Sequence, residues 1–240
     1  MSVAPSVALP QAPATNLAAR ARKRGISLLF GVIVVTSISA FALSFVSFVK
    51  PIGSGDGAPA YADIADVRSY VWAFFVIAGV QLVVGASAAA LAGWLLVPRR
   101  GSRWATAGAS LIWLGAALYG VGIGGWATIY YFGTDPQVLD PAVATRLIDH
   151  VNDDTARMLA VPIGGALLIA IGSLVLSVAL WRARSVPRWL PIATAITAIA
   201  TVLLPPDGVG GLIAEAASSA TTIAIGWYVW QAAARPSPAV

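Results

Sequence analysis

The sequence contains no cysteine and one histidine, and only 10% of its 240 residues are charged. Without cysteine the chain forms no disulfide, uses no thiolate nucleophile and holds no cysteine-ligated zinc or iron–sulfur centre. A soluble globular protein carries about 25% charged residues, so this chain has too few charges to cover a folded surface in water. Hydrophobic residues make up 58% of the chain, and the mean hydropathy is +0.82. These values predict an integral membrane protein whose main solvent is lipid.

Six apolar runs approach or exceed the length of about 20 residues that a helix needs to cross a bilayer. We therefore expect an all-α polytopic membrane protein, a bundle of six transmembrane helices. The expected spans are residues 26–49, 70–97, 104–131, 158–181, 189–204 and 208–230. The fifth run is short, so it either thins the bilayer locally or stands nearly upright. A re-entrant hairpin made of the fifth and sixth runs is the alternative.

The segments outside these spans are short. Residues 1–25, rich in alanine and proline and then basic, are expected to form a disordered cytoplasmic tail. The apolar run that follows has 24 residues, whereas the core of a signal peptide has about 7–15, so we expect a retained helix. Residues 132–157 form the one sizeable outer loop, and residues 232–240 a second cytoplasmic tail.

Basic residues are concentrated in alternate loops, which predicts the orientation of the chain. One set of polar segments holds 11 of the 15 Lys and Arg residues, and the other set holds all nine acidic residues of the loops. The eleven basic residues are Arg20, Arg22, Lys23, Arg24, Arg99, Arg100, Arg103, Arg182, Arg184, Arg188 and Arg235. Since loops with most Lys and Arg stay inside, both termini are expected in the cytoplasm (N-in/C-in).

The basic residues also indicate a bacterial source and argue against a nucleic-acid partner. Arginine outnumbers lysine 13 to 2 beside abundant alanine and glycine, which is typical of a GC-rich bacterial genome, so we expect a multi-pass protein of a bacterial cytoplasmic membrane. The net charge of +5 does not indicate a nucleic-acid partner. The positive charges border membrane helices, where they meet anionic lipid headgroups, and no basic domain exists.

Small residues recur at four-residue spacing inside the expected spans, which lets helix backbones approach closely in lipid. The series is Gly85, Ala89 and Gly93 in the second span, and Ala116, Gly120 and Gly124 in the third. Packing inside the bundle is one interpretation. The other is a contact through Gly120 and Gly124 with a protein partner or with a second copy of the chain.

The outer loop contains a predicted short helix. Asp140 followed by Pro141 is typical of a helix N-cap with proline at the first helical position. Residues 142–151 then place Val143, Leu147, Ile148 and Val151 near one face, as in an amphipathic helix lying on the membrane surface.

The opposite face of this short helix carries weak candidates for a metal site, because one histidine with carboxylates is a possible ligand set for a divalent metal. These candidates are His150, Asp149, Asp153 and Asp154. The alternative is a solvated face joined by helix ion pairs such as Asp153 with Arg157. We expect no bound metal and no cofactor.

One ionisable residue, Glu215, falls inside an expected span, where such residues face the bundle interior or water. Ser218, Ser219 and Thr222 follow it at i+3, i+4 and i+7 and complete a polar stripe. Polar residues in other spans are candidates to face this stripe. They are Gln81, Ser37, Ser44, Ser47, Thr194, Thr197 and Thr201.

Two interpretations of the stripe stay open. In the functional one, Glu215 is a protonatable site in a polar pathway. In the structural one, the hydroxyls bond back to their own helix carbonyls, and Glu215 pairs with an outer arginine, either Arg157 or Arg68.

The loop between the fourth and fifth expected spans carries the most distinctive motif. It reads Leu180-Trp181-Arg182-Ala183-Arg184-Ser185-Val186-Pro187-Arg188-Trp189-Leu190-Pro191. Together with six apolar runs and a tight turn at residues 205–208, it resembles a group of uncharacterised bacterial six-span integral membrane proteins, a domain of unknown function. The resemblance implies a six-span bundle, and it implies no activity and no catalytic residues.

No catalytic motif is present in the sequence. It has no glycine-rich phosphate loop between a strand and a helix, no Gly-x-Ser-x-Gly and no pair of histidines. We therefore expect a protein that is not an enzyme, namely a non-catalytic membrane subunit or scaffold. The first alternative is a small proton- or solute-coupled carrier or channel that uses the Glu215 stripe, and the second is an intramembrane enzyme.

Overall fold

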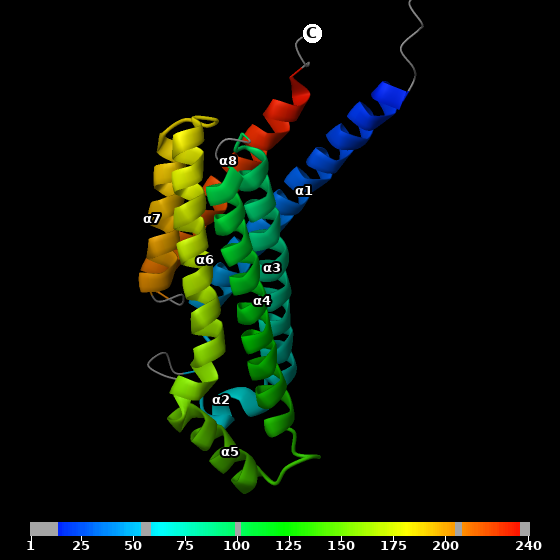
Figure 1. The fold of residues 1–240 in the computed structure, drawn as a ribbon. Helices are drawn as coiled ribbons and strands as arrows, with labels where there is room; N and C mark the ends of the chain where they lie inside the picture. Colours follow the sequence, from blue (N-terminus) through cyan, green and yellow to red (C-terminus); the bar gives the residue numbers. More distant parts are fainter. Residues whose placement is uncertain (1–13, 54–58, 99–101, 205–207, 236–240) are drawn as a thin grey trace, which may run out of the picture.

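The computed structural model describes residues 14–53, 59–98, 102–204 and 208–235 (Figure 1). All regular structure in these ranges is helical, as predicted. The helices are α1 (Ala14–Val49), α2 (Tyr61–Ala65), α3 (Arg68–Leu95), α4 (Ser102–Gly133), α5 (Pro141–Asp153), α6 (Thr155–Ala183), α7 (Trp189–Leu203) and α8 (Val209–Ala234). Within the described residues, five of them (α1, α3, α4, α6 and α8) are long and apolar enough to cross a membrane.

A sixth span would require α7, an apolar helix of 15 residues. At 1.5 Å per residue it extends about 22 Å, against ~30 Å for the hydrocarbon core of a bilayer. Because α7 is short, it ends well before the end of the molecule that carries α2 and α5 (Figure 1).

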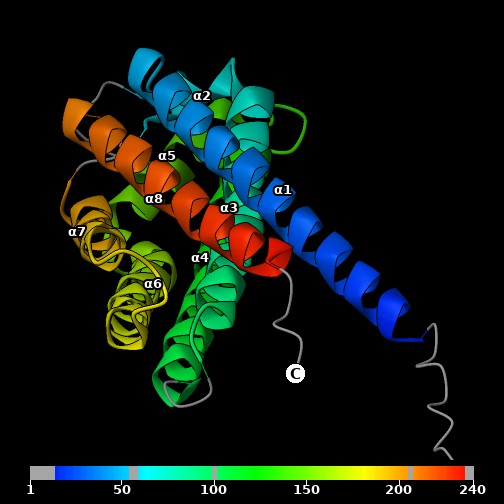
Figure 2. The same ribbon diagram turned by 90° about the horizontal axis from the view of Figure 1, so that it is seen from above.

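The long helices form two groups that cross each other. Helices α3, α4 and α6 stand side by side, with α4 between the other two (Figure 1). Helices α1 and α8 run antiparallel and lie obliquely across α3, which is clearest from above (Figure 2). Helix α7 packs against α6 and α8 and closes the remaining side.

Glycines at seven-residue spacing bring α4 and α6 into backbone contact. An added Cβ on any of them would lie 2.6–2.8 Å from an atom of the other helix, closer than real Cβ contacts come, so only glycine allows this approach. The facing pairs are Gly108 with Gly172, Gly115 with Gly165, and Gly122 with Pro162. Because lipid provides no hydrophobic force between helices, such close packing is what holds them together.

The predicted glycine series in α4 divides between two roles. A Cβ on Gly120 would lie 2.7 Å from Cγ2 of Val83, so Gly120 packs against α3 of the same chain. A Cβ on Gly124 would meet nothing within 4 Å. Gly120 therefore serves packing inside the bundle, and a contact with another chain through Gly124 stays a prediction.

The first helix begins earlier than predicted. Helix α1 starts at Ala14, so residues 14–25, which we expected to be disordered, are helical. Alanine, leucine, arginine and lysine are strong helix formers, and no proline separates them from the apolar run, so the helix continues through Gly25. Both views show this basic segment projecting away from the other helices (Figures 1 and 2).

Some predicted features lie outside the described residues. They are the structure of residues 1–13 and 236–240, the inner-loop arginines Arg99 and Arg100, and the turn at 205–207.

The short helix predicted in the outer loop is confirmed, with a different buried face. The Asp140 carboxylate accepts a hydrogen bond from the backbone N–H of Ala142, and Pro141 is the first residue of α5. Ile148 is fully buried, but Val143 and Leu147 are 43% and 37% exposed. Helix α5 contacts α2, α4 and α6 along a narrow strip, so only part of its apolar face is covered within the chain.

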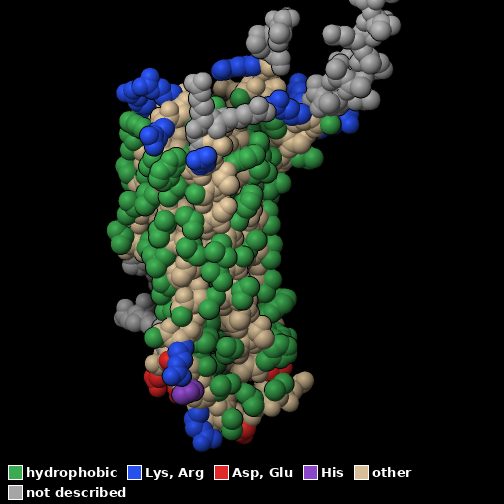
Figure 3. Space-filling model, viewed as in Figure 1, with side chains coloured by type: hydrophobic (Ala, Val, Ile, Leu, Met, Phe, Trp, Pro, Cys, Tyr) green, Lys and Arg blue, Asp and Glu red, His purple; other side chains and the backbone are tan. Residues whose placement is uncertain are grey.

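Charge is separated along the bundle. Figure 3 shows Lys and Arg side chains gathered where α1 begins and α8 ends. Acidic side chains and the histidine lie at the opposite end, around α5. The basic start of α1 and the acidic loop around α5, which the sequence assigned to opposite sides of a membrane, are therefore at opposite ends of the molecule.

Candidate functional site

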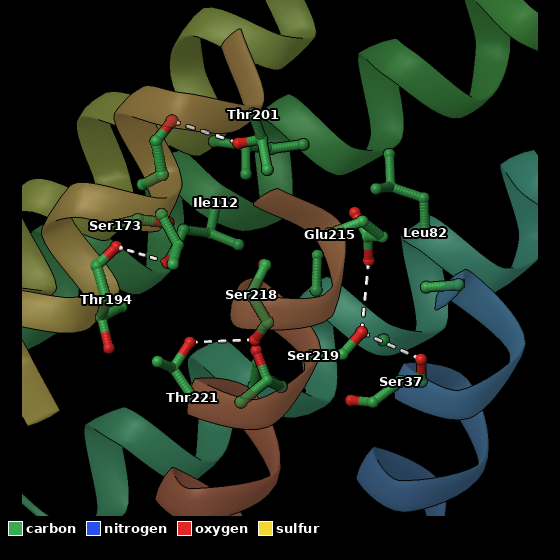
Figure 4. A pocket seen from close by; sticks show the side chains of 18 of the residues that line it. Ser37, Leu82, Ile112, Ser173, Thr194, Thr201, Glu215, Ser218, Ser219 and Thr221 are labelled. Carbon is green, nitrogen blue, oxygen red and sulfur yellow. Dashed lines mark hydrogen bonds between the residues drawn. The ribbon is translucent and has the colours of Figure 1, made fainter. Parts of the chain in front are cut away.

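A cavity of about 380 Å³ lies between the α1–α8 pair and helices α3, α4, α6 and α7. The predicted site residues Glu215, Ser218, Ser219, Thr222 and Gln81 all line this cavity. Five further predicted polar residues join them, namely Ser37, Ser44, Thr194, Thr197 and Thr201. Ser47 is not among the lining residues. The fold thus brings together polar residues from α1, α3, α7 and α8 (Figure 4).

Glu215 lies in the second turn of α8, on the face toward α1 (Figure 4). The Ser219 hydroxyl lies 3.3 Å from Oε1 of Glu215 and 3.0 Å from the carbonyl oxygen of Ser37. A hydroxyl has one proton to donate, and the shorter contact is to the carbonyl. Ser219 therefore ties α8 to α1 and leaves the Glu215 carboxylate with a long, shared hydrogen bond.

The predicted pairing of Glu215 with an outer arginine is wrong. Arg68 lies 2.6 Å from Asp135 and Arg157 lies 3.0 Å from Asp154, both at the end of the bundle near α2 and α5. Neither of the ion pairs in the described ranges involves Glu215. Because α7 and α8 turn short of that end, the acid lies deep in the bundle, away from both arginines.

Several threonine hydroxyls around the cavity bond to their own helix, as the structural interpretation predicted. The α7 hydroxyls donate to carbonyls three or four residues back, as does Thr221 to Ser218. The α7 bonds run from Thr194 to Leu190, from Thr197 to Thr194 and from Thr201 to Ala198. Gln81 is different, because its Nε2 donates to the Thr36 carbonyl at 3.2 Å and so joins α3 to α1.

Sequence reasoning missed several lining residues. Thr36, Ser173 and Thr221 line the cavity, and Tyr119 of α4 lies close enough to Glu215 to interact with it electrostatically. Tyr119 carries a signal that was available, since it is an aromatic residue in the middle of an apolar run, away from the interfaces where tyrosine is usual. The others depend on which way each helix is rotated.

Apolar side chains form the other walls of the cavity. These residues are Leu82, Ile112, Ile169, Leu176, Val202 and Ile225. The cavity volume is within the range of about 300–1,000 Å³ usual for small-molecule sites, and an apolar lining with a few polar groups is also typical of them. The arrangement is suited to hold a small amphiphilic molecule or water.

The weak metal candidates are not brought together. Asp149, His150 and Asp153 are exposed on α5, and Asp154 pairs with Arg157. The ion pair predicted between Asp153 and Arg157 is therefore wrong, because Asp154, three residues before Arg157, takes that place. In the described part of the chain, no three His, Asp or Glu residues lie close enough to hold a metal ion.

Outside the cavity, a cluster of Arg68, Asp135 and Tyr131 joins α3 to the end of α4 and the segment that follows it. Besides its ion pair with Asp135, Arg68 lies over the Tyr131 ring at 5.5 Å. The hydrogen bond from Arg68 and the backbone N–H of Gln137 hold the pKa of the Asp135 carboxyl below its usual value. This cluster fixes the ends of two neighbouring helices and lies apart from the cavity.

Comparison with protein families matches residues 24–232 to DUF4386, a domain of unknown function. The chain belongs to this family. The matched region includes every residue that lines the cavity, so the cavity is a feature of the family domain in this chain. Membership agrees with the predicted resemblance to an uncharacterised family. No curated protein and no solved structure matches the chain significantly.

Proposed function

We propose that this membrane protein is a small carrier that binds a solute in the cavity at Glu215. One observation supports the proposal above all: polar residues from α1, α3, α6, α7 and α8 converge on one cavity inside a bundle of membrane-length helices. Polar groups inside a membrane are costly, and they commonly mark ion or solute pathways. Burying a carboxylate without a basic partner costs free energy, and Glu215 has no such partner in the described residues. A purely structural role does not explain why an acid stands at this position.

The proposed topology has six spans with both termini in the cytoplasm of a bacterium. The separation of charge along the bundle supports it, because the basic end follows the positive-inside rule. The start of α1 and the end of α8 both lie at this basic end of the bundle (Figure 1). In this arrangement α7 crosses where the bilayer is locally thin or water enters beside it.

The packing supports a carrier in which one group of helices is rigid and the other moves. Backbone contacts through glycine hold α4 against α6, which gives a stiff support. The α1–α8 pair is separated from α4 and α6 by the cavity, and it packs directly against α3, where the Gln81 hydrogen bond also joins α3 to α1. Rocking of the α1–α8 pair against the support would expose Glu215 to either side in turn, the motion that carriers use.

The main alternative is a non-catalytic subunit or scaffold of a larger membrane assembly. An intramembrane enzyme has less support, because the hydroxyl that lies beside a carboxylate, Ser219 at 3.3 Å from Glu215, makes its shorter contact of 3.0 Å to a backbone carbonyl. Glu215 is the one carboxylate among the described lining residues, and the Ser219 hydroxyl is directed to the Ser37 carbonyl. The proposed carrier performs no chemical step on its solute.

The test is flux across liposomes that contain the purified protein and a pH-sensitive dye. A panel of small solutes with charges of +1, 0 and −1 is added in turn, and internal pH and solute uptake are followed. We expect uptake of at least one solute, and a fall of at least tenfold in the variant Glu215→Gln. Asp153→Asn, which removes an exposed carboxylate on α5, is the matched control and keeps full flux.

Absence of flux with every solute would contradict the carrier. Native mass spectrometry of protein extracted gently from its own membranes then tests the alternative. A stoichiometric protein partner would support the subunit, whereas a lone bundle with a bound small molecule supports the carrier.

A further inference from the structure

We infer that the cavity selects a small organic cation, an ammonium group on an apolar body, with Glu215 as its counter-ion. This inference rests on the proposed function and names the substrate class of the same site.

The charge of the lining carries the first step. Glu215 is the one acidic residue among the described residues that line the cavity, and no Lys, Arg or His lines it. An ionised carboxylate in an environment of low dielectric attracts a positive ligand far more strongly than it would in water. The same charge repels an anion, so a solute with a carboxylate or phosphate has no counter-ion here.

Hydrogen bonding gives the second step. Within the described residues the Glu215 carboxylate accepts one long hydrogen bond of 3.3 Å from Ser219, whose proton is shared with the Ser37 carbonyl at 3.0 Å. A carboxylate can accept several hydrogen bonds, so Glu215 keeps unused acceptor capacity. Ser218 and Thr222 line the cavity on the same stripe and add hydroxyl oxygens as acceptors. An ammonium group brings three N–H donors and no acceptor, which matches a site with acceptors to spare.

The walls give the third step. Leu82 lies beside Glu215, and Ile112 lies across the cavity from it (Figure 4). Leu176 and Ile225 extend this apolar lining, and Tyr119 adds an aromatic ring. A bare inorganic cation needs about six oxygen ligands and would leave these walls unused. A hydrocarbon body attached to the ammonium group covers them.

The test compares three probes that share one phenyl-ethyl body and differ in charge: 2-phenylethylamine, 2-phenylethanol and phenylacetate. Binding to the full chain in nanodiscs at pH 7.5 is measured by calorimetry. We expect the amine to bind at least tenfold more tightly than the alcohol, and phenylacetate more weakly than either. In Glu215→Gln the amine should fall to the affinity of the alcohol, whereas Glu215→Asp should keep the preference for the amine.

The controls separate the two proposals. Asp153→Asn should bind all three probes like the natural chain. Equal binding of the amine and the alcohol, or an unchanged preference for the amine in Glu215→Gln, would overturn the inference that the site selects a cation. Either result would still leave a solute site in the cavity. Failure of all three probes to bind would overturn the site itself. If Glu215→Gln does not fold, Ser218→Ala keeps the test, because it should weaken the amine severalfold and leave the alcohol unchanged.

Discussion

Asp135 and Arg68 show how a single pair of charges joins two helices. Arg68 is the first residue of α3, and Asp135 follows α4 by two residues. Their ion pair of 2.6 Å is reinforced by the Tyr131 ring beneath the guanidinium group. Both side chains are partly exposed, so solvent screens the pair. It holds the start of α3 beside the end of α4 and contributes modestly to stability.

The depressed pKa of Asp135 predicts how this contribution changes with pH. A carboxyl whose pKa is lower in the folded chain stabilises the fold above its ordinary pKa of about 3.9. The stabilisation is lost as pH falls through the folded pKa, because Asp135 then takes up a proton. We expect Asp135→Asn to lower the Tm slightly and equally from pH 5 to 8, and the difference from the natural chain to shrink as pH falls below the ordinary pKa of about 3.9.

Unfolding followed by circular dichroism in detergent measures this difference. Asp149→Asn, on the exposed face of α5, is the control and should leave Tm unchanged at every pH. A Tm difference for Asp135→Asn that does not shrink at all as pH is lowered below about 3.9 would mean that the residue acts by shape and not by charge.

Helix α4 shows how spacing within one element selects a neighbour. Its glycines at seven-residue spacing meet α6, while Gly120 meets α3, so two faces of one helix serve two contacts. Gly124 and Gly125 lie beside these contacts, with nothing within 4 Å of their Cβ positions. Glycine is therefore required at some positions of α4 and not at others.

A pair of alanine substitutions in α4 tests this distinction. In Gly115→Ala the new Cβ would lie 2.6 Å from the Gly165 carbonyl oxygen and 2.8 Å from the Ile169 nitrogen, so α4 and α6 must separate. Overpacking of this kind costs about 1–3 kcal/mol. Gly125→Ala meets nothing and should be neutral or slightly stabilising, since alanine is the better helix former. Unfolding by SDS in mixed micelles measures both, and equal stabilities would refute the contact.

The whole bundle is polarised, and the absence of cysteine makes its orientation easy to test. Single cysteines are introduced at Asp149 on α5 and at Ala234 at the end of α8, and intact spheroplasts are treated with an impermeant maleimide. The proposed topology predicts that Asp149→Cys is labelled from outside. Ala234→Cys should be labelled only after the membrane is opened, and labelling of both sites in intact spheroplasts would contradict the proposal.

A third position decides between six spans and a re-entrant hairpin. Gly208 precedes α8, beyond the end of α7. If α7 and α8 both cross the membrane, Gly208→Cys should be labelled from the same side as Asp149→Cys. Labelling from the cytoplasmic side instead would show that the two helices enter and leave on one side.

Sequence alone was enough to predict the class of protein, the position of nearly every helix and the polar stripe on α8. These properties follow from features that run along one chain: hydropathy over about 20 residues, the period of a helix, and charge at the ends of spans. The cap at Asp140 is equally local, since a side chain and a backbone N–H two residues away decide it. The early start of α1 was not predicted, because residues 14–25 have a polar, basic composition typical of disorder although most of them favour a helix.

Tertiary structure decided which faces meet, because the rotation and tilt of each helix depend on packing against its neighbours. Nothing local to α8 predicts that Ser219 bonds to the Ser37 carbonyl of α1, or that the candidate arginines pair with other acids and not with Glu215. Likewise, the four-residue glycine series stood out in the sequence, whereas the seven-residue series forms the tightest contact. The cavity exists because α1 and α8 cross the other helices obliquely, which is a property of the assembled bundle and of no single segment.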